Sequence, residues 1–149
     1  MGYNSSSSLN EAVRFHGHLG PYLILGILAG NTAVRKLKSG KYFNLYVKVW
    51  GAYKKPKSCL IDGLQLSTGA TYGKGNIEKL KGRSIWIEVT NLSNSGRIRL
   101  SLKESLVAEL KAANTHRAAE VLAKKLYKIK NCAKIFKLSP VTKINNHNP

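Results

Sequence analysis

Apolar and polar residues follow a helical rhythm in some stretches of the chain and a strand rhythm in others. The run from Leu19 to Ala29 is apolar on all sides, which is typical of a buried helix. We expect this helix over residues 21–38, with Pro21 in its first turn and Gly40 just beyond its end. The run is too short to span a bilayer, which takes about 20 residues. The pattern therefore predicts a core helix.

Four further segments show helical spacing or helix-start signals. Ser8-Leu9-Asn10-Glu11 and Ser101-Leu102-Lys103-Glu104 both match the capping box, in which a Ser or Thr side chain caps the helix and a Glu follows three residues later. They predict a brief helix ending near Gly17 and another beginning after residue 101. Residues 59–68 form a short helix, and Asn114 or Thr115 caps a last helix over residues 116–130.

Strict alternation of apolar and polar residues predicts three strands. These lie at residues 42–50, 84–92 and 97–102, and the last two form an antiparallel hairpin. Residues 69–76 are a glycine-rich loop, and we expect 131–149 to be weakly ordered. The order of elements predicts an α+β fold, a small antiparallel or mixed sheet packed with helices. We expect a single domain over residues 8–138, with flexible tails at 1–7 and 139–149.

The charge balance points to negatively charged partners. The 149 residues include 25 Lys and Arg against seven Asp and Glu, a net charge of +18. Such a surface attracts nucleic acid, anionic membranes or an acidic protein. Tyrosines and a tryptophan interleave with lysines over residues 35–57, as in proteins that bind single-stranded nucleic acid, although a lysine-rich solvated surface gives the same pattern.

Cysteine usage and the first residues favour the cytoplasm. Cys59 and Cys132 are the only cysteines and form no disulfide framework. The N-terminal residues lack the basic and then apolar segments of a signal peptide. We therefore expect a cytoplasmic protein with no transmembrane segment.

Candidate chemistry gathers at two stretches. His16 and His18 flank Gly17, and a turn there can aim both imidazoles at one point, as a transition metal requires. Cys59 would add a thiolate ligand, or would act as a nucleophile with His18 as its base. The simpler interpretation is that one histidine packs at the helix start, the other faces solvent, and Cys59 is a small buried residue.

The second stretch carries an isolated acid and a glycine-rich loop. Asp62 is suited to orient a histidine ring, to pair with Lys74, or to act as a base. The loop around Lys74 resembles a phosphate cradle, but Gly75 follows where a P-loop has Ser or Thr. Glycines that only permit a positive φ explain the loop equally well.

Taken together, the two stretches resemble the FmdE family, which takes its name from molybdenum formylmethanofuran dehydrogenase. The family pattern is Phe-His-Gly-His-x-Cys-Pro, then Cys-x-x-Asp, Gln-x-x-Thr-Gly-Cys-Thr and Gly-Lys-Gly-Asn. This chain matches it at Phe15 to Pro21, Cys59 to Asp62, Gln65 to Thr71 and Gly73 to Asn76. The resemblance covers about residues 9–110.

The resemblance implies an α+β core that usually forms a homodimer and carries a metal-binding cleft. It gives His16, His18 and Cys59 as candidate ligands of a transition metal, zinc or nickel. The candidate residues for contacting a bound ligand are Asp62, Gln65, Thr68, Lys74 and Asn76.

Two family cysteines are replaced in this chain, by Gly20 and Ala70, and this weakens a soft-metal site. The cysteine pairs of the C-terminal zinc finger found in many members are also missing. We therefore expect a cleft protein that binds a transition metal or a small anionic ligand, in an accessory role. The alternative is a degenerate fold that acts as a basic module for nucleic acid or an acidic protein.

Overall fold

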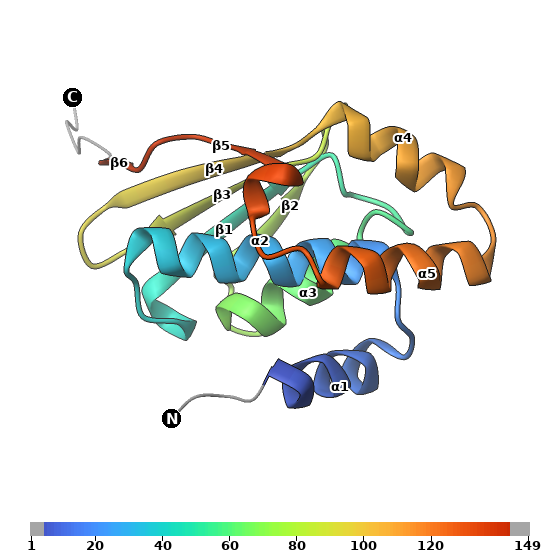
Figure 1. Ribbon diagram of the computed structural model, residues 1–149. Coiled ribbons are helices and arrows are strands. Elements are labelled where there is room, and N and C mark those ends of the chain that lie inside the picture. Colours follow the sequence, from blue (N-terminus) through green and yellow to red (C-terminus); the bar gives the residue numbers. More distant parts are fainter. Residues whose placement is uncertain (1–4, 144–149) are drawn as a thin grey trace.

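Residues 5–143 are described by the structure, a computed structural model, and they form a mixed sheet with helices packed beneath it (Figure 1). The sheet order is β2-β1-β3-β4-β5, and β6 also pairs with β4. The strands are β1 Leu45–Trp50, β2 Ile77–Leu80, β3 Trp86–Asn91, β4 Gly96–Leu102, β5 Phe136–Leu138 and β6 Thr142–Lys143. The helices are α1 Ser5–His16, α2 Pro21–Leu37, α3 Cys59–Thr68, α4 Glu104–Ala112 and α5 His116–Tyr127, with 3₁₀ turns η1 Tyr42–Asn44 and η2 Cys132–Lys134. The expected α+β class is confirmed.

The central helix α2 is buried between the sheet, α3 and α5 (Figure 1). It crosses α3 at a pair of glycines. A Cβ on Gly26 would lie 2.0 Å from the carbonyl oxygen of Leu60, and one on Gly63 would lie 2.2 Å from that of Leu23. Only glycine permits this approach, so the small residues of α2 fix the position of α3. Within residues 5–143, no helix combines the length and apolar character needed to span a membrane.

The alternation seen in the sequence sorts the two faces of the sheet. In β1, Leu45, Val47 and Val49 are fully buried against the helices. On the opposite face, Trp50 and Trp86 stack at a centroid distance of 3.6 Å. The apolar face therefore anchors the core, and the other face carries aromatic and charged side chains.

Three strands have no counterpart among those expected. β2 runs parallel to β1, with Val47 opposite Ile77, and lies at the edge of the sheet. β5 and β6 pair with β4, and Phe136 of β5 is fully buried. The expectation of weak order from residue 131 onward is therefore wrong up to residue 143. These strands have only two to four residues, too few for an alternation to stand out.

Helix and strand boundaries differ from the expected ones at several points. α1 begins at Ser5, so Ser8 lies inside the helix and does not cap it. Ser101 belongs to β4, and α4 follows Lys103 without a side-chain cap. The cap predicted for α5 is confirmed at Thr115, whose Oγ1 accepts a hydrogen bond from the Ala118 N–H at 3.1 Å. Smaller shifts are the end of α5 at Tyr127 and the start of β1 at Leu45. The parts of the expected tails at residues 1–4 and 144–149 lie outside the described residues.

Candidate functional site

A cleft of about 490 Å³ opens between the histidine turn, the first turn of α3 and the connection from α4 to α5. We call it the histidine cleft. The lining side chains that matter below are His18, Tyr22, Pro56, Cys59, Lys111 and His116. The predicted ligand candidates His18 and Cys59, far apart in the sequence, therefore line one cavity.

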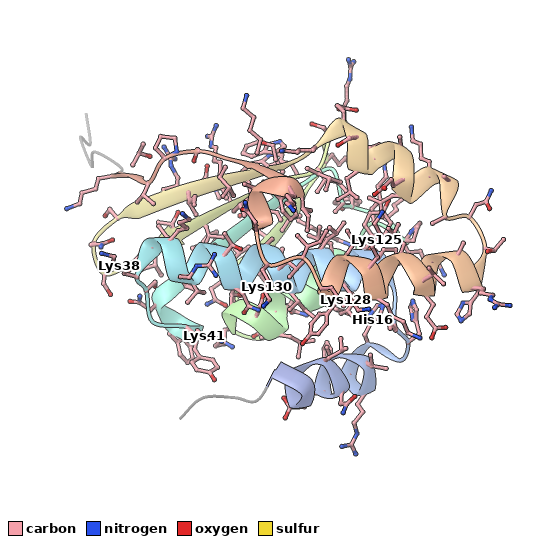
Figure 2. All side chains as sticks on the ribbon, in the orientation of Figure 1. His16, Lys38, Lys41, Lys125, Lys128 and Lys130 are labelled. Carbon is pink, nitrogen blue, oxygen red and sulfur yellow. The ribbon has the colours of Figure 1, made fainter. Side chains whose placement is uncertain are left out.

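The turn between α1 and α2 brings the two histidines together. α1 ends at His16, and Gly17 has a φ of +101°, a conformation that favours glycine. Pro21 then starts α2 at a position where its missing N–H leaves no bond unmade. The rings of His16 and His18 lie with their centroids 4.5 Å apart. Figure 2 shows His16 at the end of α1, on the side that faces the rest of the domain.

Asp62 holds His16 in one orientation. Its Oδ2 lies 2.6 Å from His16 Nδ1, and the His16 side chain is only 8% exposed. Because an ionised carboxylate only accepts hydrogen bonds, Nδ1 carries the proton. His16 Nε2 is buried and has no hydrogen-bond partner among the described residues. In the neutral ring this atom presents its lone pair. The sequence-based interpretation of Asp62 as a residue that orients a histidine is confirmed as a hydrogen bond.

His18 is exposed on the cleft wall and favours its neutral form. Partial burial, followed by the neighbouring His16 and His116, lowers the pKa of His18 below its ordinary value. The His116 ring, contributed by α5, lies 6.3 Å from the His18 ring, centroid to centroid. A neutral imidazole is the form that binds a metal or accepts a proton. His18 is therefore competent for either role at neutral pH.

Cys59 is a protonated thiol in this environment. Burial, and then the charge of Asp62, raises the pKa of Cys59 above its ordinary value. A reactive cysteine needs the opposite shift, because the thiolate is the nucleophile. The arrangement disfavours the hypothesis of a Cys59 nucleophile activated by His18. As a metal ligand, Cys59 would have to release its proton on binding.

The donor set for a metal is incomplete. Among residues 5–143, no group of three or more His, Cys, Asp and Glu side chains is arranged to hold a metal ion. Gly20 marks what is missing, since a Cβ at this position would lie 3.1 Å from His18 Nε2. The position where the family pattern has a cysteine thus points at the His18 ring. The residues present fit two imidazole donors, and the pattern's thiolate at this position is absent.

The other candidate residues lie around the loop of residues 69–76, away from the histidine cleft. Gln65 Oε1 accepts a hydrogen bond from the Tyr72 N–H at 3.1 Å. Thr68 is buried, and its Oγ1 donates to Leu64 O at 2.6 Å. The other two complete the loop: Lys74 Nζ donates to Thr71 Oγ1 at 3.0 Å, and Asn76 Nδ2 donates to Tyr42 O at 2.7 Å and to Leu45 O at 3.0 Å. Of the second stretch, Cys59 lines the histidine cleft and Asp62 reaches the histidines, while these four residues hold the loop and its neighbours.

His116, Lys111 and Thr115 are cleft residues that the sequence does not reveal. They belong to α4, α5 and the turn between them, and no motif or spacing links them to the His-Gly-His turn. Only the packing of α5 beside α2 brings them to the site. A single histidine at the start of a helix carries no signal of its own.

Comparison with known proteins supports the resemblance seen in the motifs. Residues 15–139 match the profile of the family described as FmdE, molybdenum formylmethanofuran dehydrogenase operon. A solved structure, that of an FmdE-like protein of tungsten formylmethanofuran dehydrogenase from Syntrophus aciditrophicus, matches with a TM-score of 0.65 at 20% identity. The match covers 97% of this chain and 75% of that chain. A search among curated proteins gives no match.

Proposed function

Because the chain belongs to the FmdE family, we propose that its histidine cleft binds a transition-metal ion, zinc or nickel, through His16 and His18. Zinc and nickel both accept imidazole nitrogen. Cys59 lies on the cleft wall as a third donor. The role is that of a binding protein, accessory to chemistry carried out elsewhere.

One observation carries this proposal, the buried and unpartnered Nε2 of His16. Leaving a buried polar atom unsatisfied costs about 1–3 kcal/mol, so such an atom calls for an explanation. The carboxylate on the other ring nitrogen makes the arrangement that metal-binding histidines commonly have. A metal ion in the cleft would satisfy Nε2.

The composition of the site limits how tightly it binds. With Gly20 and Ala70 in place of cysteines, coordination positions remain for water or a small anion. Lys111 lies on the same cleft and favours an anion there. A bound metal would supply Lewis acidity toward that anion, while Asp62 keeps the His16 ring in place.

Titration of metal-free, untagged protein with zinc and nickel tests the proposal. We expect one equivalent to bind to the wild type, with roughly 10–100-fold weaker binding in His16→Ala, His18→Ala and Asp62→Asn. His116→Gln is the matched control, since it removes a neighbouring imidazole that the proposal does not use as a ligand. Equal affinity in the wild type and the His16 and His18 variants, or no binding by the wild type, would contradict it.

A further inference from the structure

A second cleft of about 490 Å³ adjoins the histidine cleft and has a different chemistry. It is lined by the segment from Tyr53 to Lys57, by Gly51, and by Lys81 and Gly82. Four of these residues are lysines and none is acidic: Lys54, Lys55, Lys57 and Lys81. We call it the lysine cleft. Pro56 lines both clefts, so the two share a wall.

Tyr53 gathers positive charge at the edge of the lysine cleft. The Lys79 Nζ lies 4.6 Å from the centroid of the Tyr53 ring and donates a hydrogen bond to Tyr53 O at 3.3 Å. The Lys81 Nζ lies 5.6 Å from the same ring centroid. The negative face of an aromatic ring attracts a cation, so Tyr53 holds two lysines that would otherwise repel each other. These cations are thus placed next to those of the loop.

The floor of the lysine cleft is kept free of side chains. A Cβ on Gly82 would lie 3.1 Å from Gly51 N and 3.2 Å from Trp50 Cβ. Gly51 itself has a φ of +77°, and a Cβ there would lie 2.1 Å from Ser84 O. The two glycines let the chain pass close beneath the lysines and leave the space above them open to a ligand.

Acids that could neutralise this charge are engaged elsewhere. Glu78, next to Lys79 in β2, accepts a hydrogen bond from the Tyr46 hydroxyl at 2.9 Å. Asp62 of α3 is held by His16. Like charges gathered without counter-charge raise the free energy of the empty cleft, and a multiply charged anion lowers it. The net charge of +18 draws such an anion from a distance.

We propose that the lysine cleft binds a phosphorylated small molecule of nucleotide size that carries two or more phosphate groups. The volume falls within the usual range for small-molecule sites, about 300–1,000 Å³. Lysine is a mobile point charge that binds phosphate without a fixed geometry, and several lysines around one cavity suit several phosphates. The proposal stands apart from the metal proposal, because none of these lysines touches His16 or His18 in any hydrogen bond or ion pair found among residues 5–143.

Binding of inorganic tripolyphosphate and of ATP, measured calorimetrically without divalent metal, tests the lysine cleft. The test variant is Lys55→Gln/Lys57→Gln/Lys81→Gln. The control is Lys36→Gln/Lys38→Gln/Lys41→Gln, which removes the same charge from exposed lysines at the end of α2 and just beyond it; Figure 2 shows Lys38 and Lys41 at the end of the molecule away from His16. We expect both probes to bind the wild type, roughly 30-fold weaker binding in the test variant, and less than 3-fold in the control.

Three results would overturn this proposal. Equal losses in the test and control variants would show attraction to the whole basic surface. Absence of binding by the wild type would leave the lysine cleft without a function. A fluorescent 12-nucleotide RNA that binds while both small probes fail would assign the cleft to nucleic acid.

Discussion

Replacing Gly26 by alanine should destabilise the fold and disturb the site at the same time. The new Cβ would lie 2.0 Å from Leu60 O and 2.9 Å from Gly63 Cα. Ordinary C···O contacts are about 3.3 Å, so α2 and α3 would have to separate by roughly 1 Å. Both contacting atoms belong to the backbone of α3, and no side-chain rotation relieves the overlap.

The expected loss follows from two opposing terms. Overpacking of this kind costs about 1–3 kcal/mol and occasionally more, and a backbone contact on a buried helix lies at the upper end. Alanine recovers about 1 kcal/mol of helix propensity. A net loss of about 2 kcal/mol would lower the melting temperature by roughly 4–8 °C in a chain of this length.

Chemical denaturation and a melting curve measure this loss, with Gly40→Ala as the control. A Cβ on Gly40 would meet nothing closer than Asn44 Cβ at 3.9 Å, so that variant should stay within about 0.5 kcal/mol of wild type. Because α3 carries Cys59 and Asp62, Gly26→Ala should also weaken metal binding. A Gly26→Ala protein as stable as Gly40→Ala would refute the account of helix packing.

Three further predictions concern the cleft and the C-terminal strands. Gly20→Cys should tighten zinc binding, because its Cβ points at His18 Nε2; a third ligand is worth roughly 100-fold when about 10–16 kcal/mol is divided over four ligands, and an unchanged zinc affinity would contradict this. Iodoacetamide should alkylate Cys59 at pH 7 more slowly than an unstructured cysteine, since its pKa is raised; Asp62→Asn removes a negative charge that disfavours the thiolate and should speed the reaction, whereas a slower variant would reverse the assigned sign. Phe136→Ala should cost about 3–5 kcal/mol in denaturant unfolding, as at other buried phenylalanines, and a neutral effect would return β5 to the status of a loose tail.

Local sequence signals were sufficient for the central part of the fold. The helix at Cys59–Thr68 and the hairpin of β3 and β4 follow from patterns long enough to specify one structure. The spacing of Gly26 and Gly30 predicted a close helix crossing, which the contact with α3 confirms. β2, β5 and β6 escaped because a strand of a few residues owes its existence to a neighbouring strand, and the sequence does not show that neighbour.

The site divides in the same way. The His-Gly-His turn, Cys59 and Asp62 lie on motifs that the chain carries openly, and the structure brings them together. Lys74 and Asn76 lie on an equally clear motif, yet their bonds hold the loop after α3. A motif identifies residues that belong together, while contact with a ligand depends on where the helices place them. His116 and the lysine cleft arise from this placement alone.

The most direct test of the metal proposal is a crystal structure of zinc-loaded protein with an anomalous-scattering map at the zinc edge. The account predicts one peak in the histidine cleft within coordination distance, about 2.0–2.1 Å, of His16 Nε2 and of a ring nitrogen of His18. The same peak should vanish from His16→Ala crystals. Absence of a peak in the wild type, or a peak that leaves His16 Nε2 unpartnered, would contradict it.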